Sequence, residues 1–416
     1  MATLSLTDVN PLDPVIYGAG DPSTYGLPLD VYKYLREEKP CYVQELDNPL
    51  LIDRVWMITR HEDVWATDRD PETWAANRGL VNTFRFINID PIEYPGGKPA
   101  MLTLDGPDHR RNRAVFSHAF TPKMLTGLES KFRAFAKQVV DAALGVDGPF
   151  DFVHQVANPM PMQALGDMLG VPEADRAKFF GWVDTFASPF DTRVVTGMDQ
   201  IEAAIKHLMD YALELWDLRT REPGDDLLSA IIAGSGGQLS QDEIMGNISL
   251  LANGAAESTR TTLSHGIHQL MRDPDQMAWL RERADDIPLT VVQELVRIAT
   301  PFVHFVRTAT KDVELHGQHI KQGDRACMFF ASANFDPKAF DEPESFDLSR
   351  DPNPHVSFGR GPHSCLGKHV ASLEIKILLE ELLQRTKDIR PAGDISYISD
   401  NFSRGVYSLP ITLTKA

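Results

Sequence analysis

The sequence predicts a mainly α-helical fold with small β-sheets. Residues 121–144 and 370–386 carry apolar side chains at intervals of three and four residues, which places those side chains on one face of a helix. Residues 240–273 contain no proline and are numerous enough for one very long helix. Alternation of apolar and polar residues is confined to short runs, so only small sheets are expected.

The other elements follow in chain order from the same patterns. Residues 55–60 (VWMITR) predict a strand that precedes the helix over 121–144. Residues 312–317 (DVELHG) and 326–334 (ACMFFASAN) predict further strands after the long helix. The helix over 370–386 then lies near the end of the chain.

The long helix has a clear start and an unusual middle. Ser240 and Glu243 form the pattern of a capping box, and the next proline is Pro274. At 1.5 Å per residue, such a helix is roughly 50 Å long and crosses a whole domain. Its centre, residues 252–259 (ANGAAEST), is rich in residues that weaken helical hydrogen bonding, so we expect a functional kink there.

Composition places the chain among large cytoplasmic proteins. Its 416 residues, 43% of them hydrophobic, can bury a sizeable core without disulfides, and no repeat or linker divides them, so residues 1–416 are expected to form a single domain. The three cysteines, Cys41, Cys327 and Cys365, are odd in number and far apart, which argues against a secreted disulfide framework.

Charge and the N-terminal segment exclude other classes. The net charge of −18 opposes binding to nucleic acid. Residues 1–20 show neither a signal peptide nor a membrane span. We expect a protein without a membrane anchor, and a monomer.

Cys365 lies in a glycine-rich loop, residues 358–367 (FGRGPHSCLG), directly before a predicted helix. Amides at a helix N-terminus can hold a thiolate. Three interpretations compete: an inert buried thiol, a zinc site with His363 and His369, and axial ligation of haem iron. The zinc site lacks the paired spacing of structural zinc ligands.

The whole loop decides between them. It resembles the haem-binding loop of the cytochrome P-450 superfamily, and the resemblance extends along nearly the whole chain. It implies the cytochrome P-450 fold, a triangular-prism helical domain with haem b between a long distal helix and a proximal cysteine loop. It also implies that Cys365 is the thiolate ligand of the iron and that the loop contacts the cofactor. The residues that carry the match are Phe358, Gly359, Gly361, His363, Cys365 and Gly367.

Two further motifs agree with the resemblance. Glu294 and Arg297 match the family's Glu-x-x-Arg helix, and Arg350 matches the meander arginine that completes a structural network. Phe335 stands where the family often has a basic residue. Four residues match positions that bind the haem propionates: His109, Arg113, Arg307 and His363.

The middle of the long helix resembles the family's acid-alcohol segment. The best register places Glu257 at the acid and Ser258, in place of the usual threonine, at the alcohol. Thr259 remains the alternative alcohol. Ala255 stands where glycine is usual, and Gly254 is expected to supply the flexibility. The expected catalytic groups, which deliver protons during oxygen activation, are Glu257, Ser258 and Thr259.

Positions that contact substrate in the family are mostly apolar here, which implies a small to mid-sized hydrophobic substrate. A weaker resemblance, at the chain's end, is to bacterial members that oxidise terpenoids, alkyl-aromatics or steroids. The expected substrate residues are Leu250, Asn253, Ala255, Val303, Phe305, Phe402 and Ser403, with Phe84, Phe86 and Tyr94 in the loop above the site.

The resemblance implies a monooxygenase that uses O2. Its electrons are expected from a ferredoxin or flavodoxin with an NAD(P)H-dependent reductase, docking on a basic patch of Arg110, Arg111, Arg360 and Lys368. Two alternatives stay open: a peroxide-driven haem-thiolate oxidase, and a non-catalytic haem-binding sensor.

Overall fold

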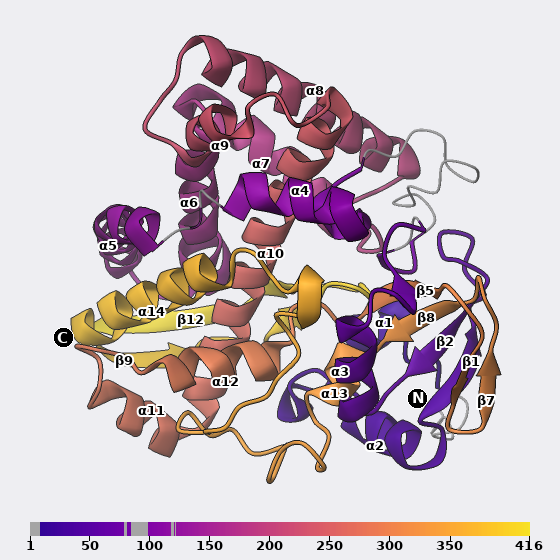
Figure 1. The fold of residues 1–416 in the computed structure, drawn as a ribbon. Coiled ribbons are helices and arrows are strands. Elements are labelled where there is room, and N and C mark those ends of the chain that lie inside the picture. Colours follow the sequence, from indigo (N-terminus) through magenta and orange to yellow (C-terminus); the bar gives the residue numbers. More distant parts are fainter. Residues whose placement is uncertain (1–8, 79–80, 85–98, 118–119, 121) are drawn as a thin grey trace.

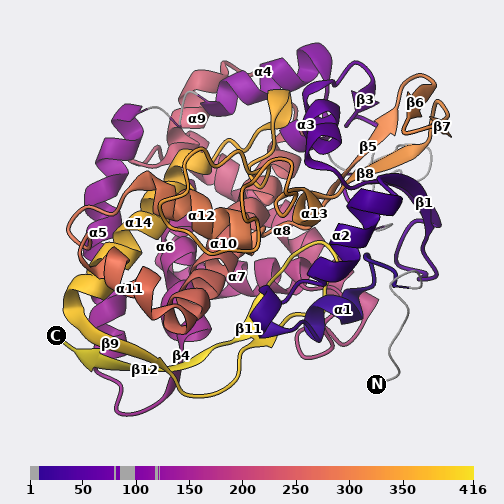
Figure 2. The ribbon, with the colours of Figure 1, turned by 90° about the horizontal axis from the view of Figure 1, so that it is seen from below.

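Helices dominate the computed structural model, which describes residues 9–78, 81–84, 99–117, 120 and 122–416. One long helix, α10, runs through the middle of the molecule, and the largest sheet lies to one side of it with α2 and α3 (Figures 1 and 2). The helices are α1 (Pro14–Gly18), α2 (Leu29–Glu38), α3 (His61–Arg69), α4 (Gly106–Ser117), α5 (Pro122–Leu144), α6 (Pro159–Leu169), α7 (Glu173–Ala187), α8 (Met198–Arg221), α9 (Leu227–Ser235), α10 (Gln241–Arg272), α11 (Pro274–Arg281), α12 (Leu289–Ala299), α13 (Phe330–Ala333) and α14 (Lys368–Arg385).

The strands form small sheets, as the sequence predicts. The largest has the order β1-β2-β8-β5-β3, in which only β2 and β8 pair in parallel. The others have the orders β4-β12-β9, β10-β11 and β6-β7. The strands are β1 (Cys41–Glu45), β2 (Arg54–Ile58), β3 (Trp74–Ala75), β4 (Phe150–Asp151), β5 (Phe305–Ala309), β6 (Val313–Leu315), β7 (Gln318–Ile320), β8 (Arg325–Met328), β9 (Thr386–Pro391), β10 (Ser396–Tyr397), β11 (Val406–Ser408) and β12 (Pro410–Lys415).

One predicted strand is partly wrong. The run 326–334 pairs as a strand only to Met328 and then turns into α13. Every residue of this run is buried, so its hydrophobicity carries no periodicity that would separate strand from helix. The backbone N–H of Ala331 donates to the carbonyl of Val303, a long-range contact that local sequence does not reveal.

The helix α10 begins where the capping box predicts. The Ser240 hydroxyl accepts from the amide of Glu243, and the Glu243 carboxylate accepts from the amide of Ser240. The helix is uninterrupted through the segment where a kink is expected. Within it the Ser258 and Thr262 hydroxyls donate to the carbonyls four residues before them, each at 2.8 Å, a pattern that bends helices without breaking them. The centre of α10 is therefore a continuous helical wall.

Close packing fixes α10 against its neighbours. It contacts α6, α8, α12 and α14, and its C-terminal half is buried on nearly every side. A Cβ added at Gly266 would lie 3.1 Å from the Leu295 side chain of α12, so the glycine permits the close approach of these two helices. The cysteine loop leads directly into α14, which places Cys365 at the N-terminal end of a helix that packs on α10.

Candidate active site

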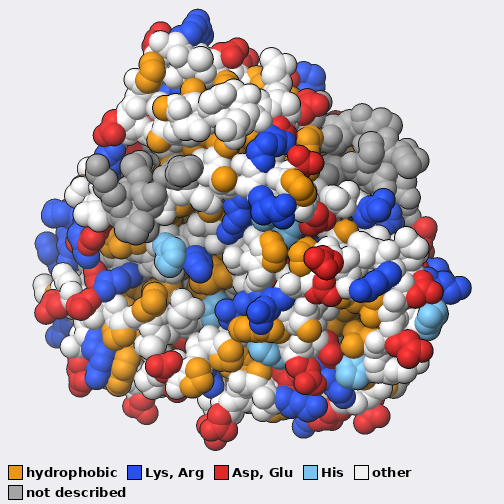
Figure 3. All heavy atoms as spheres, viewed as in Figure 1, with side chains coloured by type: hydrophobic (Ala, Val, Ile, Leu, Met, Phe, Trp, Pro, Cys, Tyr) orange, Lys and Arg blue, Asp and Glu red, His pale blue; other side chains and the backbone are white. Residues whose placement is uncertain are grey.

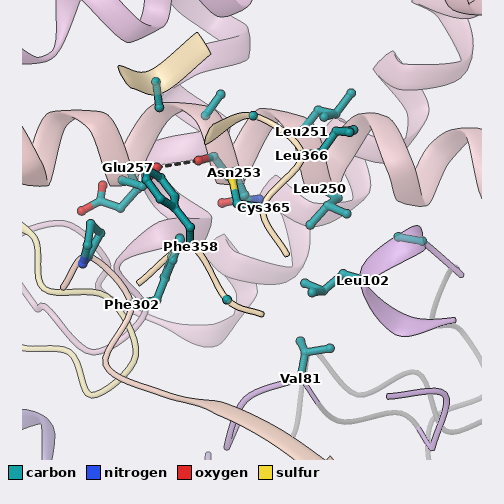
Figure 4. A pocket seen from close by; sticks show the side chains of 18 of the residues that line it. Val81, Leu102, Leu250, Leu251, Asn253, Glu257, Phe302, Phe358, Cys365 and Leu366 are labelled. Atoms are coloured by element: carbon teal, nitrogen blue, oxygen red, sulfur yellow. Dashed lines mark hydrogen bonds between the residues drawn. The ribbon is translucent and has the colours of Figure 1, made fainter. Parts of the chain in front are cut away.

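A cavity of about 730 Å³ lies between the centre of α10 and the cysteine loop. Most of the side chains that line it are apolar, and in Figure 4 the labelled residues of α10 and of the cysteine loop surround one space. The cavity reaches from Cys365 at one end to side chains of α6 and α8, such as Met168 and Met209, at the other. Its size and lining suit an apolar ligand that is mostly enclosed.

The cysteine loop is shaped by glycines and by one backbone bond. Gly359 and Gly361 have φ values of +65° and +66°, and a Cβ at Gly361 would lie 2.8 Å from the carbonyl oxygen of Asp68. The amide of Cys365 donates to the carbonyl of Phe358 at 2.7 Å, which closes the loop. The Cys365 side chain is exposed, and it is exposed into the cavity.

The surroundings of the Cys365 sulfur suit a thiolate once a metal shares its charge. Burial of the loop raises the pKa of the thiol, but the amides of Gly367 and Lys368 donate toward the sulfur and lower it, as does the charge of Arg113. Within the described residues, no group of three or more His, Cys, Asp or Glu side chains could hold a metal ion, so the zinc alternative finds no ligand set. A lone thiol that faces a large cavity instead fits the axial position of a haem iron.

Three of the four predicted propionate residues line the same cavity: Arg113, Arg307 and His363. Arg307 pairs with Asp68 at 3.3 Å, and His363 Nε2 lies 3.1 Å from Asp105 Oδ1. Arg113 donates to the carbonyl of Ser364 at 2.7 Å. This cluster of cationic and hydrogen-bonding groups beside the cysteine loop fits the carboxylates of a haem.

His109 lies behind this cluster rather than on the cavity wall. Its ring centroid is 4.4 Å from that of His363, and its Nε2 is buried without a hydrogen-bond partner. Burial, together with the nearby His363 ring and the charge of Arg113, lowers the pKa of His109 to about 4. An unsatisfied nitrogen at this point fits an incoming carboxylate, which would supply the missing partner.

The predicted network behind the cysteine loop is assembled in the structure. Glu294 and Arg297 are fully buried and make two bonds of 2.8 Å, and Arg350 Nε lies 3.3 Å from Glu294. Arg297 also donates to three backbone carbonyls of residues 334–345. Phe335, at the departure from the family pattern, is buried with its ring 5.2 Å from the Arg297 guanidinium.

The predicted distal acid, Glu257, is buried in a network of its own. One carboxylate oxygen pairs with Arg260, which also donates to Asp184 at 2.8 Å. The other oxygen accepts from the hydroxyls of Thr261 at 3.1 Å and Ser403 at 3.0 Å. Glu257 lines the cavity, so its carboxylate joins the ligand space to a chain of charges that leads outward to the half-exposed Asp184.

The two candidate alcohols occupy different surroundings. Ser258 lines the cavity, is half-buried, and donates to the carbonyl of Gly254. Thr259 also borders the cavity, but it is buried and its hydroxyl bonds to the Glu374 carboxyl group of α14. Burial raises the pKa of Glu374 to about 8, so this acid is neutral at pH 7. No local sequence pattern marks Glu374 as a site residue, because only the packing of α14 on α10 brings it to the cavity.

Comparison with known proteins agrees with this geometry. Residues 161–394 match the family model described as Cytochrome P450. The chain belongs to the cytochrome P450 family. It is 33% identical over 86% of its length to a methyl-branched lipid omega-hydroxylase of Mycobacterium tuberculosis, covering 83% of that protein. It is 34% identical over 85% of its length to a steroid C26-monooxygenase of Rhodococcus jostii, covering 74% of that protein.

A solved cytochrome P450 of Mycobacterium marinum, in complex with pseudoionone, superimposes on the chain with a TM-score of 0.87. The two sequences are 34% identical, and the match covers 96% of this chain and 97% of that one. The predicted fold, a mainly α-helical cytochrome P450 with small sheets, is therefore confirmed, and so is the enzyme class. The chain is a P450 monooxygenase whose cofactor is thiolate-ligated haem b.

The structure brings most of the predicted substrate residues of this P450 to the cavity. Val303 is the exception: its side chain is fully buried in the core and lines no part of the cavity. Its backbone bridges Phe402 and Ala331, which turns the side chain inward, and the neighbouring Phe302 lines the cavity instead. The residues that do line it are Leu250, Asn253, Ala255, Phe305, Phe402 and Ser403, together with Phe84; Phe86 and Tyr94 lie outside the described residues.

The predicted basic patch is only partly available. Arg111 is held by Glu243 and by the carbonyl of Gln238, and Arg360 donates to the carbonyl of His355 while it stacks on Trp65. Local sequence cannot show these long-range partners. The other two residues, Arg110 and Lys368, are exposed. Figure 3 shows several Lys and Arg side chains gathered over the middle of one face of the molecule.

Among the helices of the described residues, none is both long and apolar enough to pass through a membrane.

Proposed function

We propose that Cys365 is the iron ligand of this P450 and that the enzyme hydroxylates a small to mid-sized hydrophobic substrate of terpenoid, alkyl-aromatic or steroid-like type. The observation that carries this proposal is the Cys365 thiol facing a cavity of about 730 Å³ that Glu257 and Ser258 of α10 also line. We also propose that residues 1–416 form a single domain.

In this proposal, Arg113, Arg307, His109 and His363 hold the propionates, and Phe358, Gly359 and Gly367 frame the haem next to the sulfur. The haem supplies the reductive activation of O2, in which one oxygen atom enters a C–H bond and the other leaves as water. The reaction consumes two electrons and two protons per product molecule. The protein supplies orientation and a controlled path for those protons.

The substrate class is inferred from the cavity wall. Phe302, Phe305 and Phe402 pack ring to ring at 5.0–5.8 Å and present a rigid apolar surface. Relatives named for methyl-branched lipids and steroids, and a neighbour solved with pseudoionone, support extended apolar substrates. The test is a screen of terpenoids, alkylbenzenes and steroids for a low-spin to high-spin shift of the Soret band, followed by product analysis. If no member of these classes shifts the band or gives product, the proposed substrate class is wrong.

Asn253 and Ser249 are polar side chains in the mostly apolar wall of the cavity. Both line it from α10, one helical turn apart. The Ser249 hydroxyl is buried without a partner, and the Asn253 amide makes only a long bond of 3.5 Å to the carbonyl of Ser249. Their unused hydrogen-bonding capacity suits a hydroxyl or carbonyl oxygen on an otherwise apolar substrate.

Replacing Asn253 by alanine is expected to weaken the binding of ligands with one oxygen function by about 1–2 kcal/mol, because one hydrogen bond is lost. Binding of hydrocarbons of the same size should stay unchanged. Spectral titration of matched alcohol and hydrocarbon ligands measures both affinities, and Leu250→Ala serves as a control that removes an apolar wall residue and weakens both classes. Equal losses for both classes in Asn253→Ala would show that Asn253 has no anchoring role.

Electrons are proposed to come from a ferredoxin or flavodoxin and its NAD(P)H-dependent reductase. The exposed Arg110 and Lys368 suit an acidic partner. NAD(P)H-driven product formation with a surrogate ferredoxin supports this proposal, whereas turnover by hydrogen peroxide alone would favour the peroxide-driven alternative. The buried acid Glu257, with its outward chain of charges, favours the route that needs proton delivery.

A further inference from the structure

The loop between β10 and β11, residues 398–405, lies against the distal acid. The Ser403 hydroxyl donates to Oε1 of Glu257 at 3.0 Å. A Cβ added at Gly405 would lie 2.7 Å from the same oxygen, so the backbone of the loop packs directly on the carboxylate. Ser403 is only 3% exposed. The Ser403 hydroxyl is therefore used in the bond to Glu257, although the residue also borders the cavity, where the sequence predicts a substrate contact.

The same loop carries a second carboxyl group, Asp400, which is 1% exposed. Its Oδ1 accepts from the amides of Phe402 at 2.6 Å and Ser403 at 3.0 Å. Its Oδ2 is buried without any hydrogen-bond partner, and Asp400 pairs with no cation among the described residues. Burial strongly disfavours an ionised carboxylate when one of its oxygens has neither a hydrogen-bond donor nor a cation beside it.

The charged groups around Asp400 point to the same protonation state. The pKa of Asp400 is raised to about 8, because burial and the charges of Glu257 and Asp191 together outweigh the two amide bonds that lower it. Arg260 of α10 pairs with Glu257 and with Asp184 of α7, and Arg193 pairs with Asp191 on the outer side of the loop. None of these cations is bonded to Asp400.

Asp191 shows the contrast. Burial raises its pKa, but bonds from Arg193 and from the amide of Ser399 hold the pKa below its usual value. Arg193 also donates to the carbonyl of Tyr397 and to the Ser396 hydroxyl. An ionised acid thus anchors the outer end of the loop, and a second acid without a cation lies at its inner end.

We propose that Asp400 is carried as a neutral carboxylic acid and that the β10–β11 loop, through Ser403, is a positioning element for the Glu257 carboxylate. Neutral Asp400 caps the two amides that set the Ser403 backbone without adding a second negative charge beside Glu257. The proposal rests on the proposed role of Glu257 as the distal acid. Ser403 and Asp400 are positioning residues, because neither bonds to a cofactor or a substrate in this account.

The protonation state of Asp400 can be tested by stability. In the unfolded chain an aspartate titrates near pH 4, whereas in the folded protein Asp400 titrates at about pH 8. Between these values the unfolded chain releases a proton that the folded protein keeps, so the stability contribution of this group falls as pH rises from about 4 to about 8 and then levels off. Asp400→Asn keeps the acceptor for both amides and cannot ionise.

We therefore expect the melting temperature of the Asp400→Asn holoenzyme to exceed that of wild type by a margin that grows between pH 5 and pH 8. The difference between the two proteins cancels titrations at other sites. Infrared spectra of protein labelled with carboxyl-¹³C aspartate should show a protonated carboxyl band at pH 7 that Asp400→Asn lacks. A difference in melting temperature between the two proteins that does not change from pH 5 to pH 8, or a wild-type spectrum without that band, would overturn the neutral acid.

The positioning role needs a second experiment. Ser403→Ala removes the hydroxyl, and Ser403→Thr keeps it as the matched control. We expect Ser403→Ala, but not Ser403→Thr, to raise the solvent isotope effect on turnover about 2-fold and to shift its pH profile, with little change in KM. In combination with Glu257→Gln, the effect of Ser403→Ala should largely disappear.

The outcomes separate this inference from the proposed function. If Glu257→Gln impairs turnover and Ser403→Ala leaves the isotope effect and pH profile unchanged, the positioning role is wrong and the distal acid stands. If Glu257→Gln itself has no effect, the proposed role of Glu257 fails, and the infrared and stability results still decide the state of Asp400.

Discussion

Cys365→Ala is expected to lose the thiolate-type Soret band of the reduced carbonyl complex and all monooxygenase activity. The thiol faces the cavity from a loop that the Phe358 carbonyl closes, and the amides of Gly367 and Lys368 donate toward the sulfur. Alanine leaves this loop able to fold but offers no ligand to the iron. Haem should then bind weakly through its propionates or be lost.

The measurement compares wild type, Cys365→Ala and Cys41→Ala after reduction under carbon monoxide. Cys41 is buried in β1, distant in sequence from Cys365, and does not line the cavity. The Cys41→Ala variant should therefore keep the thiolate-type band. Thermal unfolding gives a second readout, because loss of a tightly bound cofactor removes its stabilisation of the folded state. A histidine-type spectrum in natively folded wild-type protein would contradict the assignment of Cys365.

The sequence predicts those parts of the site that depend on neighbours along the chain. The capping box of Ser240 and Glu243, the i, i+3 pair of Glu294 and Arg297, and the cysteine loop are all set by short-range geometry, and the structure has each of them. Local patterns in the sequence also predict the helices α5, α10 and α14 and the strands β2 and β6, whereas most of the other short strands carry no pattern that was recognised.

The remaining parts depend on contacts between distant segments. Val303 and Phe302 are both apolar neighbours, and only the pairing of their segment with residues 402–404 decides which one lines the cavity. Glu374 and Thr259 meet because α14 packs on α10. The bond from Ser403 to Glu257 spans 146 residues, so no spacing rule could have found it.

The distal residues give the second large expected effect. Glu257→Gln keeps the shape of the side chain but removes its ionisable group and weakens the pairing with Arg260. Because a positioned acid or base contributes typically a factor of 100 or more, we expect turnover to fall roughly 100-fold and the solvent isotope effect to rise. Substrate binding, measured by the Soret shift, should be nearly unchanged.

Ser258→Ala is expected to fail differently. Ser258 lines the cavity and is only half-buried, and the bond of its hydroxyl to the Gly254 carbonyl uses its proton but leaves its oxygen able to accept. Without the Ser258 hydroxyl, proton delivery to the ligand side of the cavity is no longer directed by this residue. NAD(P)H should still be consumed, and most of the reduced oxygen should leave as hydrogen peroxide rather than enter product.

Thr259→Val is the matched control, because it removes a neighbouring hydroxyl and preserves the branched shape. That hydroxyl bonds to Glu374, which is neutral at pH 7, so its loss should lower thermal stability and leave product formation coupled to NAD(P)H consumption. Product, peroxide and NAD(P)H are measured together in all three variants. If Thr259→Val releases peroxide while Ser258→Ala stays coupled, the acid-alcohol register is one residue further along α10. If neither releases peroxide, no side-chain hydroxyl at these positions orders the protons, and the role assigned to Ser258 is wrong.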